Sequence, residues 1–107
     1  MLVNKQEISW GIIYNIMDEN GYSFCRLSDF GTFLFISDLN VIETERGKGL
    51  GKTIMLFVLN LAKQLRPKIS IELNVKKGNW VVTWYKRLGF KIDRSYKDVS
   101  NWRMYCT

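Results

Sequence analysis

Residues 41–62 read VIETERGKGLGKTIMLFVLNLA, and they join a glycine-rich basic turn to a long apolar segment. Within residues 46–52, glycine stands at every second position and three basic side chains lie among the glycines. Residues 51–65 contain no helix breaker after the first residue and are apolar nearly all round, which predicts a buried helix. The first amides of a helix have no intrahelical acceptors and lie at the positive end of its dipole, where anions bind. The stretch therefore predicts an anion-binding loop at the start of a central helix.

The spacing of the glycines shows which of several phosphate-binding motifs the loop matches. A Walker A loop would need glycine at the position of Arg46, and the dinucleotide fingerprint GxGxxG would need its third glycine one place after Gly51. The pattern Arg/Gln-x-x-Gly-x-Gly/Ala is satisfied by Arg46, Gly49 and Gly51. Because glycine has no Cβ, a pyrophosphate can approach the amides closely. The alternative is a solvated turn that binds no ligand.

Before this stretch, the sequence predicts three strands. Residues 8–16 (ISWGIIYNI) alternate large apolar side chains with smaller or polar ones. Residues 22–27 (YSFCRL) and 32–41 (TFLFISDLNV) read as strands that follow the turn signals DENG and SDFG. Short turns between successive strands predict an antiparallel meander.

After the central helix, the pattern alternates between strand and helix. Residues 68–75 (KISIELNV) predict a strand with its apolar residues on one face. Asn79 is placed to cap a helix over residues 80–88, and Gly89 supplies the left-handed residue that ends it. Two final short strands are predicted at residues 90–97 and 101–106. The order β-β-β-α-β-α-β-β predicts a mixed α/β (α+β) domain.

Length and composition limit the class of protein. The 107 residues leave room for one domain, 1–107, and a net charge of +6 favours an anionic partner. The absence of histidine excludes His-dependent triads and His-ligated zinc, and the two cysteines match no metal-binding spacing. The first residues lack a signal-peptide layout, and no apolar run is long enough to span a membrane. We therefore expect a cytoplasmic protein with free thiols and no metal.

Two segments resemble landmarks of one known family. Residues 41–62 are similar to the acetyl-coenzyme A signature of the GNAT superfamily of N-acetyltransferases, and residues 85–90 (YKRLGF) are similar to the end of that family's last large helix. The distance between the segments and the intervening strand also agree. The resemblance covers about residues 22–107. It implies an acyl-CoA N-acyltransferase (GNAT-like) fold, in which the meander joins a central parallel strand pair and the helices pack on the sheet.

The resemblance implies how the cosubstrate acetyl-CoA would bind. Main-chain amides of the glycine-rich loop would hold the pyrophosphate of coenzyme A. The end of strand 32–41 would pair with the pantetheine arm where this strand splays from strand 68–75, and Asn79 would lie near the arm. The residues implied to bind the cosubstrate are Leu39, Asn40, Val41, Arg46, Gly47, Lys48, Gly49, Leu50, Gly51, Lys52 and Asn79.

The resemblance also implies direct acetyl transfer to an amine without a covalent enzyme intermediate. Tyr85 matches the tyrosine that often protonates the leaving thiolate, and an unperturbed phenol is protonated at neutral pH. Amides of strand 32–41 would polarise the thioester carbonyl. Without histidine, Asp38 and Glu72 are the candidate general bases. The alternatives are ordinary ion-paired carboxylates with water carrying the proton, and a Tyr85 that only packs on its helix face.

The chain departs from the family pattern at three places. Glu43 stands where proline is common, and Asn79 stands six residues before Tyr85 rather than seven, next to the bulky Trp80. Family members usually begin with a strand and helices that build one wall of the acceptor site, whereas the residues before position 22 read as a strand and a turn. We expect an acceptor side that is shortened, open or completed by a second subunit, which makes a homodimer a prediction.

The preferred function is transfer of an acetyl group from acetyl-CoA to a primary amine of a small molecule or protein. The first alternative is a catalytically reduced protein that binds coenzyme A and acts by contacting a partner, which the shortened acceptor wall favours. A basic nucleic-acid-binding module ranks lower, because the Lys and Arg residues are evenly scattered apart from the loop. The simplest alternative is a domain without a ligand.

The remaining large and basic side chains are assigned to the core and the surface. Trp10, Trp84 and Trp102 are predicted to lie in the core. The pairs Lys76-Lys77 and Lys86-Arg87 are predicted to be solvated, with the 3′-phosphate of coenzyme A or an acidic partner as their alternative ligands.

Overall fold

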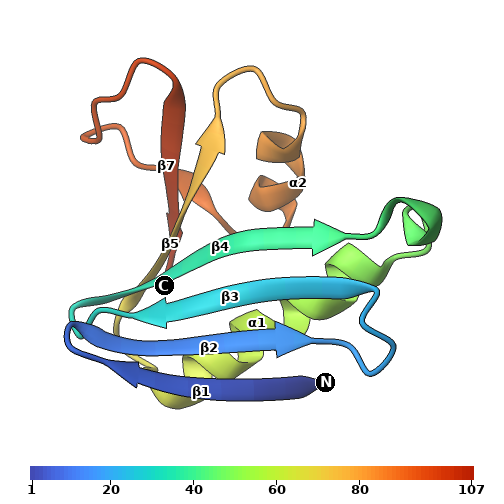
Figure 1. Cartoon of the computed structure of the whole chain (residues 1–107). Helices are drawn as coiled ribbons and strands as arrows, with labels where there is room; N and C mark the ends of the chain where they lie inside the picture. Colours follow the sequence, from blue (N-terminus) through green and yellow to red (C-terminus); the bar gives the residue numbers. More distant parts are fainter.

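The computed structural model describes residues 1–107 and has one seven-stranded sheet with two α-helices packed against it (Figure 1). Helix α1 crosses behind the first four strands, and α2 lies beside the far end of the sheet. The elements in chain order are β1 (Leu2–Ile8), β2 (Gly11–Met17), β3 (Ser23–Asp29), β4 (Phe33–Val41), the 3-10 turn η1 (Glu43–Glu45), α1 (Leu50–Leu65), β5 (Ser70–Lys76), α2 (Val81–Arg87), β6 (Lys91–Ile92) and β7 (Asn101–Cys106).

The strand order across the sheet is β1-β2-β3-β4-β5-β7-β6. Every neighbouring pair is antiparallel except β4 and β5. These two run parallel because α1 returns the chain to the edge of the sheet at which β4 begins. The predicted fold class is therefore confirmed, with an antiparallel meander joined to a central parallel pair.

Strand β1 is the main element that the sequence analysis missed. Its residues pair with β2 from Leu2↔Met17 to Ile8↔Gly11, so the strand predicted at residues 8–16 is split by a tight turn. The side chains of β1 are almost all exposed, and its sequence LVNKQEI therefore lacks the alternation of apolar and polar residues that marks a half-buried strand.

The last part of the chain also differs from the prediction. The strand expected at residues 90–97 is reduced to Lys91–Ile92. The side chain of Asp93 accepts a hydrogen bond from the Ser95 amide at 3.0 Å, and that of Asp98 accepts one from the Ser100 amide at 2.8 Å. These local bonds favour turns over a continued strand.

The core lies on one face of the sheet, where 17 buried hydrophobic residues form a single cluster. Helix α1 contributes Ile54, Met55, Val58, Leu59 and Ala62 to it, and α2 contributes Tyr85. The helix was predicted to be buried all round, but its outer face is exposed, and Leu56 keeps 48% of its surface accessible. A helix that packs on one face of a sheet buries only one stripe of its surface.

The assignment of tryptophans to the core is wrong for Trp10. Its side chain is 46% exposed and stacks on Phe30 with 4.5 Å between ring centroids, at the turn between β1 and β2. Trp84 and Trp102 do pack against the core cluster, as predicted.

Gly11 is required where β2 passes the end of β3. A Cβ on Gly11 would overlap the carbonyl oxygen of Asp29, a main-chain atom of the last residue of β3. We expect Gly11→Ala to lower the free energy of unfolding by about 2–3 kcal/mol, because the backbone must move to relieve the overlap. Urea denaturation measures the change, and a loss below about 0.5 kcal/mol, the usual range of a surface substitution, would contradict this account.

Candidate functional site

Strands β4 and β5 separate at their carboxyl ends. Their parallel ladder runs from Phe33↔Ser70 to Ile36↔Leu73, although β4 continues to Val41 and β5 to Lys76. Figure 1 shows β4 and β5 diverging beyond this point. The splay that the family resemblance implied is therefore confirmed.

A β-bulge in β4 accompanies the separation. The register with β3 passes from Arg26↔Ser37 to Phe24↔Asn40, so two residues of β4 oppose one residue of β3. Asp38 lies in this bulge and has a φ of 57°, which is uncommon for a residue other than glycine. A bulge bends a strand and increases its twist, which directs the end of β4 away from β5.

The glycine-rich loop presents free amides at the start of α1. Gly47 and Gly49 have φ values of 82° and 81°, and Gly49 occupies the N-cap of this 16-residue helix. The first helical hydrogen bond is donated by the Thr53 amide to the Gly49 carbonyl at 3.0 Å. No amide from Gly47 to Lys52 donates a hydrogen bond to another protein group. The loop therefore offers consecutive N–H groups to an anion at the positive end of the helix dipole.

The three basic residues of the loop are not equivalent. Arg46 donates from Nε to the Val41 carbonyl at 2.9 Å, which ties the loop to the end of β4. Lys48 forms an ion pair with Glu45 at 3.1 Å. Lys52 is exposed and makes no hydrogen bond or ion pair, so its charge is the one that remains free for an anionic ligand.

A cavity of about 670 Å³ lies between the loop, the end of β4 and the start of α2. Of the residues implied to bind acetyl-CoA, all except Lys48 line it, and the candidate acid Tyr85 lines it as well. The lining residues are Leu39, Asn40, Val41, Glu45, Arg46, Gly47, Gly49, Leu50, Gly51, Lys52, Asn79, Trp80, Val81, Trp84 and Tyr85. The structure thus brings together segments that lie up to 46 positions apart in the chain, from residue 39 to residue 85.

Tyr85 forms the inner wall of this cavity and is 9% exposed. Its ring makes edge contacts with Trp84 and Phe90, with centroid distances of 5.1 and 5.8 Å. Its hydroxyl has no hydrogen-bond partner in the protein, and no fully buried side-chain oxygen lacks a partner, so this hydroxyl reaches the cavity. Burial raises the pKa of Tyr85 to about 12, with Cys25 as a secondary cause. The phenol therefore carries its proton throughout the neutral range.

The start of α2 holds a capping residue and an exposed tryptophan. Asn79 accepts a hydrogen bond from the Val81 amide at 3.1 Å, as expected of a helix cap. Trp80 is 75% exposed and lies at the mouth of the cavity. The sequence analysis treated Trp80 only as a bulky neighbour of Asn79 and did not predict that its ring is exposed.

The two candidate bases lie outside this cavity. Asp38 pairs with Arg26 at 3.0 Å, and Glu72 pairs with Arg103 at 2.7 Å. Arg103 also donates to Asn74 at 2.6 Å and stacks over the ring of Phe35. Glu72 alternates with the buried residues of β5, and Asp38 is exposed in the bulge of β4. A base role for Asp38 or Glu72 stays a prediction, and it would require loosening an ion pair.

No group of three or more His, Cys, Asp and Glu side chains is arranged to hold a metal ion. No helix is both long and apolar enough to cross a membrane. Both cysteines, Cys25 and Cys106, are free thiols, as predicted.

Comparison with known proteins finds acetyltransferases. A family model described as an acetyltransferase (GNAT) domain matches residues 15–104. Comparison with curated proteins finds no match. Among solved structures, the fold is similar to that of an acyl-CoA N-acyltransferase from Pseudomonas aeruginosa, with a TM-score of 0.73, 19% identity, and coverage of 90% of this chain and 68% of that chain.

Two further similar structures contain coenzyme A. One is an acetyltransferase from Bacillus subtilis in complex with CoA (TM-score 0.71, 20% identity, 92% of this chain and 77% of that chain). The other is the PaiA N-acetyltransferase from Thermoplasma acidophilum in complex with coenzyme A (TM-score 0.70, 21% identity, 87% of this chain and 58% of that chain). At these identities the likeness shows a shared fold.

Proposed function

The chain belongs to the GNAT acetyltransferase family, and from this premise we propose that it transfers an acetyl group from acetyl-CoA to a primary amine of a small molecule or protein. The observation that carries the proposal is the cavity in which free loop amides, the splayed end of β4 and the Tyr85 hydroxyl meet. The loop amides would bind a diphosphate, the splayed end of β4 would bind the extended pantetheine arm, and the Tyr85 hydroxyl would donate a proton.

The loop and β4 would hold the two ends of the coenzyme. The amides of residues 47–52 would donate to the diphosphate, and the free ammonium of Lys52 adds a positive charge beside them. The main chain from Leu39 to Val41 lines the cavity and would pair with the amides of the pantetheine arm. This order directs the thioester toward the separation of β4 and β5 and toward Tyr85.

Tyr85 would act as the general acid. The amine attacks the acetyl carbonyl carbon, the carbon–sulfur bond breaks, and the sulfur takes the phenolic proton as the thiol of coenzyme A leaves. Because burial keeps this phenol protonated, it can donate a proton at neutral pH. The attacking nitrogen loses its proton to water or to one of the paired carboxylates.

Trp80 would contact the nucleotide end of the coenzyme. The reacting end must lie inside the cavity near Tyr85, so the adenine lies toward the mouth, where Trp80 is exposed. A base stacked on an aromatic ring contributes about 1–3 kcal/mol. We expect acetyl-CoA to quench the fluorescence of Trp80 and S-acetylpantetheine, which lacks the nucleotide, to leave it unchanged. The signal should disappear in Trp80→Phe and persist in Trp10→Phe, and quenching that persists without Trp80 would contradict the assignment.

A substitution at Gly51 is expected to weaken ligand binding without destabilising the fold. Its backbone is helical, and a Cβ there would meet only the Val41 side chain, at 3.7 Å. We expect Gly51→Ala to leave the free energy of unfolding unchanged or to raise it by up to about 1 kcal/mol, because alanine favours a helix. The added methyl group would hold a diphosphate away from the amides, so the Kd for acetyl-CoA should rise about tenfold. Calorimetry and urea denaturation of one sample test both statements, and an unchanged Kd would contradict the second.

A protein that binds coenzyme A and acts through a partner is the second candidate, because both candidate bases are held in ion pairs. Release of thiol from acetyl-CoA on addition of amines tests the enzymatic proposal. Tight binding without amine-dependent thiol release would favour the partner role. A homodimer and a cytoplasmic location remain predictions, and sedimentation of the purified chain tests the first.

A further inference from the structure

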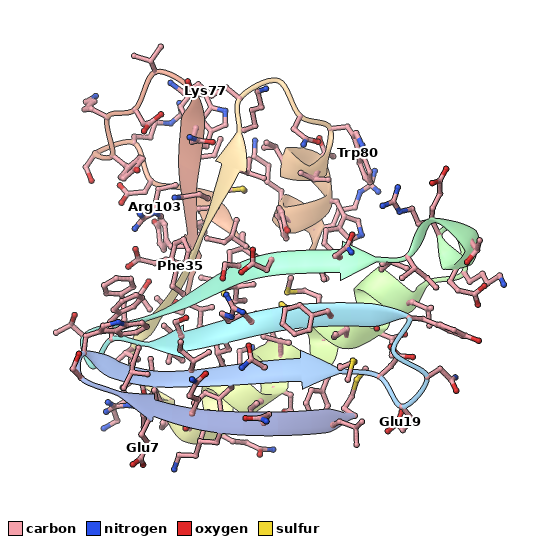
Figure 2. The ribbon with its side chains drawn as sticks, in the orientation of Figure 1. Glu7, Glu19, Phe35, Lys77, Trp80 and Arg103 are labelled. Atoms are coloured by element: carbon pink, nitrogen blue, oxygen red, sulfur yellow. The ribbon has the colours of Figure 1, made fainter.

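A second cavity of about 570 Å³ lies between the β6–β7 connection and the ends of β5 and β7. Its lining residues are Lys77, Arg94, Tyr96, Lys97, Asp98, Val99 and Trp102, and none of them lines the first cavity. Figure 2 shows Lys77 beside β7 and Trp80 on the opposite side of α2. The connection between β5 and α2 therefore separates the two cavities.

The second cavity carries positive charge that the protein does not neutralise. Its one carboxylate, Asp98, accepts hydrogen bonds from the amides of Ser100 and Asn101 at 2.8 and 2.9 Å. Arg94 forms no ion pair and no side-chain hydrogen bond, and Lys97 donates only to a carbonyl oxygen, at 3.3 Å. Two cationic groups are thus free to bind an anionic ligand.

Two aromatic rings that line this cavity contact basic side chains. The ammonium of Lys77 lies 4.4 Å from the centroid of the Trp102 ring and donates to the Asp98 carbonyl at 2.6 Å. Lys77 is exposed, as predicted, and these contacts orient its ammonium against the cavity wall. Tyr96 lies under the guanidinium of Arg103, at 4.6 Å from the ring centroid. These contacts link the β6–β7 connection to β7 and to the residue that follows β5.

A chain of stacked groups leads from this cavity to the separation of β4 and β5. Arg103 stacks on Tyr96 on one side and lies 5.2 Å from the ring centroid of Phe35 on the other. Phe35 pairs with Glu72 in the ladder, one position before the last pair, Ile36↔Leu73. A ligand in the second cavity would therefore lie near the place where the thioester is expected, on the side not occupied by coenzyme A.

We propose that the second cavity binds carboxylate groups of the acceptor, so that the acetylated amine belongs to an acidic molecule. The inference rests on the proposed function, because it assigns the acceptor of the same reaction. Arg94 and Lys97 would pair with the carboxylates, while the amine extends past Tyr96 and Phe35 toward the open strands. A polycationic acceptor would be repelled by the same side chains.

The test measures binding directly and does not depend on turnover. Three peptides, Ser-Glu-Glu-Gly, Ser-Gln-Gln-Gly and Ser-Arg-Arg-Gly, carry a fluorophore at the carboxyl end and have the terminal amine as their only acetylatable group. Their Kd values are measured by anisotropy with and without coenzyme A, in low salt and in high salt. The acidic peptide should bind about tenfold more tightly than the neutral one, and the preference should fall with salt.

Charge-matched variants locate the preference on the protein. Arg94→Ala with Lys97→Ala should remove it, whereas Arg87→Ala with Lys68→Ala, which loses the same charge from exposed positions outside both cavities, should retain it. Equal Kd values for the three peptides, no binding of any peptide, or a preference that survives in the first variant would overturn the proposal. Calorimetry with acetyl-CoA and thiol release on addition of amines test the proposed function without these peptides, so its failure would be seen separately from a failure of peptide binding.

Discussion

Replacing Gly49 with glutamate is expected to weaken acetyl-CoA binding by at least about 100-fold, or ~2.7 kcal/mol. Gly49 occupies the N-cap of α1 beside the free amides of the loop. A carboxylate at this position would accept hydrogen bonds from those amides and occupy the place of the diphosphate, and its charge would repel the ligand. Hydrogen bonds to charged groups contribute about 1.5–3 kcal/mol each, so the loss of two accounts for the expected effect. Isothermal titration calorimetry measures the Kd.

Gly31→Glu is the matched control for this variant. Gly31 lies in the turn between β3 and β4 with a φ of 89°, close to the 81° of Gly49, and neither glycine has an atom within 4 Å of an added Cβ. Both substitutions therefore impose similar backbone strain and the same charge, but only Gly49 lines the cavity. If the two variants bind acetyl-CoA equally well, the loop does not hold the diphosphate.

Tyr85→Phe is expected to lower kcat by about 100-fold or more, the usual contribution of a general acid, and to leave the Kd for acetyl-CoA nearly unchanged. The phenylalanine ring can keep the edge contacts with Trp84 and Phe90. Because the hydroxyl has no partner in the protein, its removal should change the free energy of unfolding by less than about 1 kcal/mol. Single-turnover thiol release measures the chemical step.

Tyr14→Phe serves as the control, because Tyr14 is a buried tyrosine of β2 outside the cavity. It should keep wild-type kcat. The raised pKa of Tyr85 also fixes a pH dependence: the buried neutral phenol contributes stability that is fully present below pH ~10 and is lost as pH rises toward 12. Tyr85→Phe should therefore flatten the alkaline loss of stability. A Tyr85→Phe variant that retains full kcat would show that Tyr85 only packs against its neighbours.

The part of the site that could be predicted from sequence is the part set by local chemistry. Gly47 and Gly49 adopt left-handed conformations, and the helix begins at Leu50, directly after the second of them. Asn79 caps α2, and Gly89 ends it with a φ of 104°. Each of these features depends on residues within one turn of each other, so a short stretch of sequence contains all the necessary information.

The part that could not be predicted depends on register between distant strands. Arg26 and Asp38 are 12 positions apart, and Glu72 and Arg103 are 31 positions apart, and both pairs form only when the strands align. The sequence marked both carboxylates as candidate bases without showing that a guanidinium lies beside each one. Strand β1 was missed for a related reason, since an exposed edge strand has no apolar face that a sequence pattern can display.

The second cavity could not be predicted from sequence patterns either. Lys77 directly follows β5 whereas Trp102 lies in β7, and the basic residues of the β6–β7 connection look like an ordinary solvated turn in the sequence. Only the folded chain shows that Arg94 and Lys97 line the same cavity as the rings of Tyr96 and Trp102.

The central claim is that the amides of the loop bind the diphosphate of acetyl-CoA, and an ¹H–¹⁵N correlation spectrum during a titration with acetyl-CoA tests it most directly. Glycine amides appear in their own region of such a spectrum and provide internal controls. The account predicts large shifts for Gly47, Gly49 and Gly51, which line the cavity, and small ones for Gly21 and Gly31, which do not. Loop resonances that stay in place at saturating acetyl-CoA, or shifts confined to other parts of the chain, would contradict it.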